Sequence, residues 1–332
     1  MTRQISVEIL RGATVESRHR GAACVVDAGG ALVAAWGDID QAVFPRSAIK
    51  AFQALPLLES GAVEALSLSD AQIALACGSH SGTDAHVAEA KAMLQKVGLS
   101  EHDLACSAHW PFGEAAARAL ARRAAMPCRL HNNCSGKHAG FLCAAHQRGA
   151  PSTGYIDPYH PIQREMVAGI EAMTGARLSD VTAALDGCGI LTYGQPMRSL
   201  ARGFARLASC EGLSAGRAAA VRRIRAAVAA QPDFVAGEGR FDTTVMRHFG
   251  VRLFTKAGAE GVFCAAIPEL GYGVAVKAED GALRAAEALL AATLLSVWHT
   301  DDGDTAVLRQ AGWPPIRDWG GRIVGETRVV IE

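Results

Sequence analysis

Two residues near the beginning of the chain could together cleave an amide. Ser47 and Lys50 stand three positions apart, in a stretch of good helix formers that follows Pro45. At this spacing two side chains share one face of a helix, with Cβ atoms roughly 5–6 Å apart. A serine hydroxyl becomes a strong nucleophile when a base takes its proton, and a lysine can be that base where apolar surroundings favour the neutral amine. The pattern therefore predicts an activated serine in the opening turn of a helix.

A second serine and a second lysine fit the same chemistry. Ser79 lies in a loop flanked by glycines, a setting in which side chains can point into a cleft. Lys256 follows an expected strand and precedes Gly258 after one small residue, as in the K-T-G element of penicillin-recognising serine enzymes. Taken alone, a loop serine is usually a turn residue, and a lysine before a turn is usually solvated. Together with Ser47 and Lys50, the two residues indicate a hydrolase that works through an acyl-enzyme.

Thiols and an amine form another group of candidates. Cys134 and Lys137 are three residues apart where a helix is expected to begin, and Asp186 and Cys188 share a glycine-containing turn. Thiolates are good zinc ligands, but the sequence has no C-x-x-C pair, so a structural zinc finger is not expected. The alternative is that these cysteines are free thiols that pack as small hydrophobic side chains, which is what we expect of the other cysteines.

Charge and composition exclude several classes of partner. The 332 residues carry 33 basic and 33 acidic side chains, so no basic field is available for nucleic acid or anionic lipid. The first eight residues lack the apolar core of a signal peptide, and the most apolar run, residues 285–298, is too short to span a membrane. Nine cysteines without an export signal indicate a reducing compartment, and we expect a cytoplasmic protein.

The hydrophobic periodicity predicts strands at both ends of the chain and helices between them. Strands are expected at residues 5–11, 22–26, 31–36, 251–255, 261–267, 271–277 and beyond 317. Helices are expected at residues 47–55, 70–76, 83–97, 113–125, 135–148, 161–174, 196–209, 214–230 and 282–298. This order differs from the alternation of a parallel α/β sheet and predicts an α+β fold. We expect one domain over residues 1–332, with an antiparallel sheet from about 1–40 and about 250–330, flanked by helices, and an inserted helical region from about 45–240.

Five segments, taken together, resemble the rhizobial-type, or class 3, L-asparaginases. They are residues 44–50 (FPRSAIK), 76–82 (ACGSHSG), 131–138 (HNNCSGKH), 186–189 (DGCG) and 256–261 (KAGAEG). The resemblance extends in order over nearly the whole chain, and the segments around Ser47 and Cys134 are its most specific parts. It implies a fold related to serine β-lactamases and glutaminases, which agrees with the order of strands and helices. It also implies hydrolysis of L-asparagine to L-aspartate and ammonia by a cytoplasmic homodimer.

The resemblance further implies roles for four residues in catalysis. Ser47 matches the family's nucleophile and Lys50 its base. Ser79 and Lys256 match a second Ser–Lys pair that activates the first pair or relays protons.

The remaining roles implied by the resemblance concern zinc and the substrate. One zinc ion per chain would support substrate positioning more than the chemistry, and its ligands would be Cys134, Lys137 and Cys188. The amino-acid head group would be held by Arg46, His138 and Asp186. Within that group, Arg46 would pair with the α-carboxylate and Asp186 with the α-ammonium.

Two other functions are compatible with the same residues. The first is a β-lactamase-like or peptidase-like serine amidase, although the missing export signal counts against substrates of the cell wall. The second is a non-catalytic, zinc-dependent protein that binds an amino acid, which predicts binding of asparagine without release of ammonia. Glutamine could be a second substrate, because a pocket discriminates an additional methylene only modestly.

Overall fold

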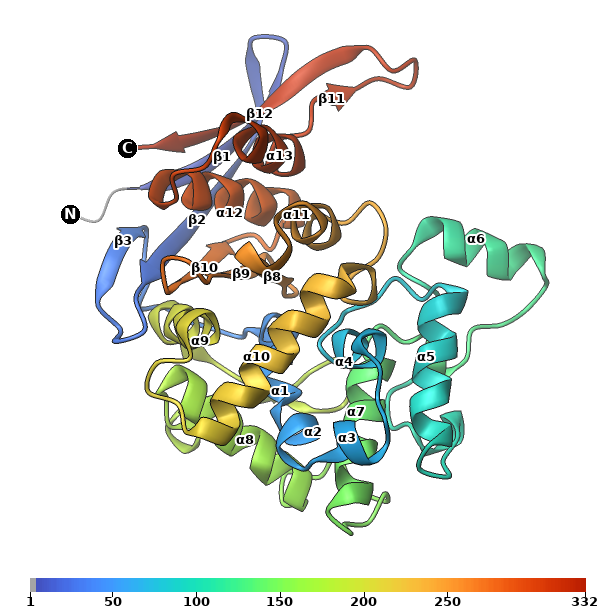
Figure 1. The fold of residues 1–332 in the computed structure, drawn as a ribbon. Helices are drawn as coiled ribbons and strands as arrows, with labels where there is room; N and C mark the ends of the chain where they lie inside the picture. The colour runs from blue at the N-terminus through green and yellow to red at the C-terminus, as the bar shows by residue number, and fades with distance from the viewer. Residues whose placement is uncertain (1–3) are drawn as a thin grey trace.

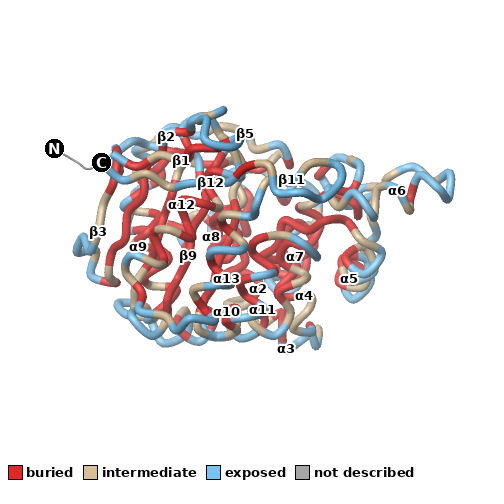
Figure 2. The backbone as a smooth tube through the Cα atoms, turned by 90° about the horizontal axis from the view of Figure 1, so that it is seen from above, coloured by how far each residue is buried: buried red, intermediate tan, exposed pale blue. Residues whose placement is uncertain are grey.

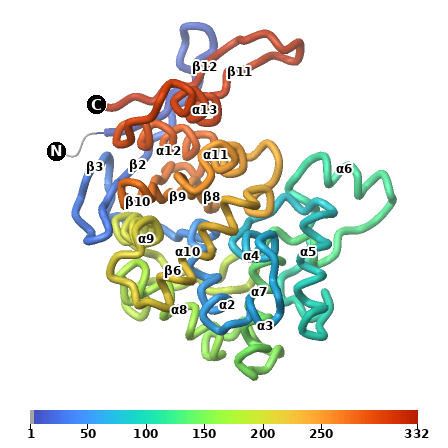
Figure 3. Tube along the Cα trace, in the orientation of Figure 1, coloured from blue at the N-terminus to red at the C-terminus, as the bar shows by residue number. Residues whose placement is uncertain are grey.

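The computed structural model describes residues 4–332, and its largest sheet has eight antiparallel strands. The strands run in the order β11-β12-β1-β2-β10-β9-β8, with β3 paired to β2 (Figure 1). Their bounds are β1 Ile5–Arg11, β2 Thr14–Val26, β3 Leu32–Trp36, β8 Phe254–Ala257, β9 Val262–Ile267, β10 Tyr272–Ala278, β11 Ile316–Arg317 and β12 Ile323–Ile331. Because β1 pairs with both β2 and β12, strands from the two ends of the chain lie side by side, in blue and red in Figure 3. The expected antiparallel sheet is confirmed.

Most of the helices lie between β3 and β8 in the chain, and the last two follow β10 (Figure 1). They are α1 Lys50–Gln53, α2 Leu55–Glu59, α3 Ala62–Ala65, α4 Asp70–Ala76, α5 Asp84–Gln95, α6 Glu114–Arg122, α7 Ser135–Gln147, α8 Pro161–Thr174, α9 Met197–Ser209, α10 Ala215–Ala230, α11 Phe241–Phe249, α12 Leu283–Val297 and α13 Asp302–Gly312. Two short strand pairs join β4 Ala42–Val43 to β7 Gln195–Pro196, and β5 Ala183–Leu185 to β6 Leu191–Tyr193. Helix α7 is buried from Ser135 to Ala145 and forms the centre of the helical region.

Burial of the inner strands on both faces explains why they read as continuous apolar runs. All six residues of β9 are buried, and both α9 and α12 contact β9 and β10. Helix α9 comes very close to β10, since a Cβ atom built on Gly273 would lie 1.9 Å from the carbonyl oxygen of Ala201. Only glycine permits this approach, so any larger residue at position 273 would push α9 away from the sheet.

Several helices begin and end at the residues that the sequence indicates. Ser69 and Thr83 each accept a hydrogen bond from the backbone of the first turn, in capping boxes that begin α4 and α5. Helix α8 begins at Pro161 and ends before Gly175, whose φ of 73° is the left-handed conformation of a helix C-terminus. Of these helices, α4 and α5 flank the loop that carries Ser79.

The structure differs from the expectation where polar residues occupy regular elements. Strand β2 begins at Thr14 rather than at the expected Ala22. The sequence pattern missed its first half because this half carries charged residues, such as Arg18, which pairs with Glu8 of β1. Residues 250–252 form a 3₁₀ turn, so β8 begins only at Phe254. Helices α11 and α13 were not predicted, although Phe241, Val245 and Phe249 of α11 recur at the four-residue spacing of a helix face.

The buried residues lie where the sheet and the helices pack together. In Figure 2 the buried segments gather in the sheet and the helices packed against it, while α6 extends away from the rest of the molecule and is largely exposed. Across residues 4–332, no helix combines the length and the apolar character that crossing a membrane requires.

Candidate active site

Ser47 lies in a 3₁₀ turn, η1 (Arg46–Ile49), that leads directly into α1. Pro45 precedes the turn with a φ of −71°, and the first hydrogen bond runs from the N–H of Ala48 to the carbonyl of Pro45 at 3.0 Å. Side chains three residues apart nearly eclipse each other in a 3₁₀ helix. The turn therefore keeps Ser47 and Lys50 on the same side of the chain.

A cavity of about 240 Å³ opens beside Ser47. Its walls come from five separate segments and consist of Arg46, Ser47, His109, Phe112, Asn132, Asn133, Cys134, Asp186, Gly187, Cys188 and Ala259. Arg46 has a φ of +50°, in the left-handed region that non-glycine residues seldom adopt. Backbone strain of this kind is concentrated at functional sites, and here it directly precedes the candidate nucleophile.

Lys50 is completely buried, and its amine contacts Ser79. The Nζ atom lies 2.6 Å from the carbonyl oxygen of Gly78, 2.9 Å from the Oγ atom of Ser79 and 3.3 Å from the carbonyl oxygen of Asn133. Within the described residues, the Ser47 hydroxyl has no hydrogen bond to Lys50 or to any other group. The candidate base thus lies on the same side as Ser47 but is hydrogen-bonded to the second serine.

Lys256 completes a row of polar groups behind the cavity. It lies in β8, is fully buried, and places its Nζ atom 3.3 Å from Ser79 Oγ and 2.6 Å from the carbonyl oxygen of Ala257. Burial lowers the pKa of Lys256 from 10.5 to about 7, although the carboxylate of Asp242 opposes the change, and the charge of Lys50 adds to it. Close to neutral pH, Lys256 can therefore be either a proton donor or a proton acceptor.

The three groups form a continuous path for a proton. When Lys256 is neutral, Lys50 donates to Ser79 Oγ, Ser79 donates its proton to Lys256, and Lys256 donates to the carbonyl oxygen of Ala257. A shift of protons along this path leaves Lys50 without its charge and able to accept a proton. The second Ser–Lys pair is thus arranged to change the protonation state of the first lysine.

The thiols and the amine that were predicted as zinc ligands lie together beside the same cavity. Lys137 Nζ is 3.0 Å from the Sγ atom of Cys188, and the Cys134 thiol is the neighbour of the Cys188 thiol. The interaction with Cys188 holds the pKa of the Cys134 thiol well below its usual range. Burial disfavours the charge on Lys137, but the two sulfur atoms raise its pKa.

This cluster is suited to a zinc ion in its donor atoms and in their burial. Two thiols and an amine converge, and each of the three side chains is at least 95 % buried. Sulfur and nitrogen are the donors that zinc prefers. In residues 4–332 no group of three His, Cys, Asp or Glu side chains is arranged to hold a metal, so a site here would need the lysine as its third protein ligand.

Two of the three predicted head-group contacts lie at the cavity and bind each other. Arg46 Nε donates to Asp186 Oδ1 at 2.6 Å, and both residues line the cavity. The N–H of Gly187 donates to the same carboxylate oxygen at 2.6 Å. These contacts fix a guanidinium and a carboxylate side by side, as recognition of a zwitterion requires.

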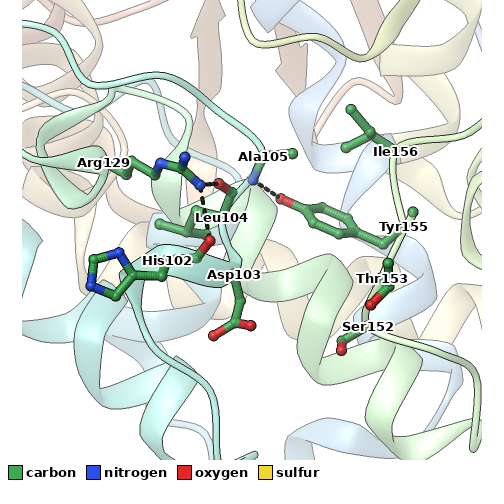
Figure 4. Close-up of a pocket in the computed structure, with 10 residues that line it drawn as sticks. His102, Asp103, Leu104, Ala105, Arg129, Ser152, Thr153, Tyr155 and Ile156 are labelled. Atoms are coloured by element: carbon green, nitrogen blue, oxygen red, sulfur yellow. Dashed lines mark hydrogen bonds between the residues drawn. The ribbon is translucent and has the colours of Figure 1, made fainter.

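His138 lies behind the cavity wall. Its side chain is fully buried, Nδ1 is 2.6 Å from the hydroxyl of Tyr155, and Nε2 has no hydrogen-bond partner. Burial holds its pKa well below the usual range. Figure 4 shows that Tyr155 also faces a separate pocket of about 290 Å³, where its hydroxyl accepts a hydrogen bond from the N–H of Ala105 at 2.8 Å. The structure therefore does not bring His138 into the cavity beside Ser47.

Sequence reasoning missed four residues of the cavity wall: His109, Phe112, Asn132 and Asn133. The two asparagines belong to the 131–138 segment that was singled out for Cys134, so their place was available from the sequence. His109 and Phe112 lie in a loop whose apolar and aromatic residues carry no recognisable spacing, and only the folded chain brings this loop to Ser47.

The chain was compared with protein families, with curated proteins and with solved structures. The family described as L-asparaginase II matches residues 7–329, and no curated protein matched in a sequence comparison. Among solved structures, Mglu in its native form has a TM-score of 0.45 at 14% identity, with 88% of this chain and 64% of that chain covered; this chain thus spans less than two thirds of Mglu. A β-lactamase from Mycobacterium bovis has a TM-score of 0.44 at 16% identity, covering 83% and 94%. A mutant of simvastatin synthase from Aspergillus terreus has a TM-score of 0.37 at 13% identity, covering 78% and 85%.

Proposed function

The chain belongs to the L-asparaginase II family, whose members are amidohydrolases, and we propose that it hydrolyses L-asparagine to L-aspartate and ammonia through an acyl-enzyme on Ser47. The observation that carries the proposal is the position of Ser79 Oγ, 2.9 Å from Lys50 and 3.3 Å from Lys256, next to the cavity that Ser47 lines. Ser47 is preferred to Ser79 as the nucleophile because Ser79 does not line this cavity and is already bonded to both lysines.

In the first step, Ser47 Oγ attacks the side-chain amide carbon of asparagine. Its proton passes to neutral Lys50, and a C–O bond forms as the carbonyl oxygen becomes an oxyanion. Lys50 then returns a proton to the amide nitrogen, directly or through Ser79, and the C–N bond breaks. Ammonia leaves, and an aspartyl ester remains on Ser47.

In the second step, water takes the place of the amine. Lys50 accepts a proton from water as the water oxygen attacks the ester carbon, and the ester C–O bond breaks as Ser47 Oγ regains a proton. Lys256 sets the protonation state of Lys50 through Ser79 in both steps, since the three groups are hydrogen-bonded in one row.

Two backbone N–H groups are available for the oxyanion. The N–H of Ser47 precedes the first hydrogen bond of η1, and N–H groups ahead of that bond have no partner within the turn. The N–H of Ala259 belongs to the turn after β8, whose hydrogen bonds use the N–H groups of Gly258 and Val262. Both Ser47 and Ala259 line the cavity, so they form a candidate oxyanion hole.

The cavity supports a single amino acid as the substrate. Its volume of about 240 Å³ accommodates asparagine or glutamine but not an extended peptide. Arg46 would pair with the α-carboxylate and Asp186 with the α-ammonium, and their ion pair would hold both in register. His138 would act from behind the wall, by holding α7 through Tyr155.

A zinc ion is part of the proposal. Its ligands would be Cys134, Lys137 and Cys188, and Lys137 must be deprotonated to bind it. Bound there, it would supply a positive charge at the cavity wall that helps to position the substrate. The further expectations of a homodimer, a cytoplasmic location, one domain over the whole chain, and no nucleic-acid or membrane partner also remain proposals.

An ammonia-release assay tests the proposed function. Wild type should release ammonia from L-asparagine, and Ser47→Ala should lose at least about a thousandfold in kcat. Ser107→Ala is a matched control, because Ser107 is an exposed serine whose side chain makes no hydrogen bond within the described residues. Full activity of Ser47→Ala would exclude Ser47 as the nucleophile.

The same assay separates the two alternatives. A chromogenic cephalosporin that is hydrolysed faster than asparagine would favour a β-lactamase-like amidase. Asparagine binding without ammonia release from wild type would favour the non-catalytic binding protein.

A further inference from the structure

The rim of the Ser47 cavity carries an exposed aromatic side chain. Phe112 is 59% exposed yet lines the cavity, so its side chain lies where the cavity meets solvent. A large apolar side chain in this position gains burial only when a ligand covers it. Phe112 is therefore placed to contact the substrate.

The ring of Phe112 is held by a stack on His109. The two ring centroids are 4.7 Å apart, and the ring planes differ by 18°. His109 is fixed in turn, because its Nδ1 lies 2.7 Å from the carbonyl oxygen of Trp110, and its Nε2 lies 3.0 Å from the backbone nitrogen and 3.2 Å from the side-chain Oδ1 of Asn133. These contacts at both ring nitrogens hold the imidazole in one orientation.

The loop that carries both rings is tied down at its two ends. Asn132 Nδ2 donates to the carbonyl of Ser107 at 2.6 Å, and the N–H of Gly113 donates to the carbonyl of Ser81 at 2.9 Å. Pro111 between them is buried and fixes its own φ. The rim is therefore a rigid wall, and it cannot easily move aside for a larger substrate.

His109 also connects the rim to the candidate base. Asn133 donates its N–H to His109, while its carbonyl oxygen accepts a hydrogen bond from Lys50 at 3.3 Å. A displacement of His109 would thus shift the carbonyl that orients the Lys50 amine.

We propose that Phe112 is a specificity-determining residue that limits the substrate to an unsubstituted side-chain amide, and that His109 is a positioning residue that holds both Phe112 and Asn133. The inference rests on the proposed function. It goes further by naming the class of substrate that the rim rejects, namely amides that carry a bulky group on nitrogen.

The test compares L-asparagine with L-aspartic acid β-(4-nitroanilide). In Phe112→Ala, kcat/KM for the anilide relative to asparagine should rise at least about tenfold over wild type, whereas Phe112→Trp should keep the wild-type ratio. Trp110→Ala is the matched control, because Trp110 is an exposed aromatic of the same loop that does not line the cavity. An unchanged ratio in Phe112→Ala, or an equal rise in Trp110→Ala, would overturn the role of Phe112.

Binding measurements keep this test separate from the proposed reaction. In a Ser47→Ala background, calorimetry gives the Kd of both compounds without turnover, and adding Phe112→Ala should tighten anilide binding relative to asparagine. If wild type released no ammonia but this shift occurred, the proposed reaction would fail and the size limit would stand. If neither compound bound either protein, both would fail.

The role of His109 is tested by a split between kcat and KM. His109→Phe keeps an aromatic ring for the stack but removes the acceptor for Asn133, so kcat should fall about tenfold while KM for asparagine stays within about twofold. His109→Ala should lose both functions and also accept the anilide. A wild-type kcat in His109→Phe would contradict the positioning role.

Discussion

Replacing Asp242 by asparagine should move the acidic limb of the pH–activity profile to lower pH. Asp242 is buried, and its two carboxylate oxygens accept hydrogen bonds from Thr255 Oγ1 at 2.9 Å and from the N–H of Ala257 at 3.3 Å. Thr255 and Ala257 flank Lys256 in the chain, and the negative charge of Asp242 favours the protonated form of Lys256. An asparagine amide can keep both contacts, because its oxygen accepts the N–H and its NH₂ donates to the hydroxyl. The substitution therefore removes a charge with little change in shape.

The size of the effect follows from the pKa of Lys256, which is about 7. If catalysis needs neutral Lys256, about 10% of the wild-type enzyme is competent at pH 6 and about 90% at pH 8. An opposite charge in close range shifts a pKa by roughly one unit or more. In Asp242→Asn the midpoint should fall to about 6, so the relative activity at pH 6 should rise about fivefold.

The assay is kcat/KM for ammonia release between pH 5 and pH 9. Asp304→Asn is the control, since Asp304 is also a buried, hydrogen-bonded aspartate but lies on α13. Glu287→Gln is a second control, because burial raises the pKa of Glu287 to about 7 although it takes no part in the proposed path. A midpoint that stays at 7 or rises in Asp242→Asn, or that moves in Glu287→Gln, would refute the assignment to Lys256.

Three further outcomes are expected. Lys256→Met should abolish ammonia release but raise the Tm at pH 6 by several degrees. In wild type the pKa of this lysine is about 10.5 when unfolded and about 7 when folded, so the stability of wild type rises with pH between these values. The difference in Tm between Lys256→Met and wild type should therefore shrink toward pH 10. Calorimetry at both pH values checks this, and a lower Tm at pH 6 would contradict it. Cys134→Ala should reduce zinc from one ion per chain to none, measured by mass spectrometry after dialysis, whereas Cys143→Ala in helix α7, which directly follows Cys134, should retain it; equal zinc in both would exclude the proposed ligand set. Arg46→Lys should raise KM for asparagine at least about tenfold with kcat little changed, since lysine cannot replace the planar pairing with Asp186 and a carboxylate; a changed kcat at constant KM would assign Arg46 to the chemistry instead.

Much of the fold could be predicted from the sequence because its signals are local. The apolar runs of β9 and β10, the cap at Ser69 and the Pro161–Gly175 limits of α8 each depend on a few neighbouring residues. The first half of β2 could not be predicted, since its charged residues are stabilised by partners such as Glu8 across the sheet. Pairing between distant strands leaves no trace in the periodicity of either strand alone.

The candidate site, like the fold, could be predicted from the sequence only in part. The spacing of Ser47 and Lys50 predicts that they share one side of the chain, but a continuous helix over residues 47–55 was wrong, because Ser47 lies in the 3₁₀ turn η1 and α1 begins only at Lys50. Their hydrogen bonds could not be predicted either: Lys50 bonds to Ser79 rather than to Ser47. The position of His138 behind the wall could not be foreseen either, because the sequence marks it only as the neighbour of Lys137. Which side of a buried helix faces a cavity depends on what packs against it, here Tyr155.

The contact between Ser79 and Lys256 has a consequence for how activity arises during folding. It joins residues 177 positions apart, so the complete proton path forms only after a very large loop has closed and β8 has entered the sheet. Closures of this length come late, after local helices such as α4 have formed. Under the proposed mechanism, a chain in which β8 has not joined the sheet lacks the contact between Ser79 and Lys256, so Ser47 would gain its reactivity only when the sheet is complete.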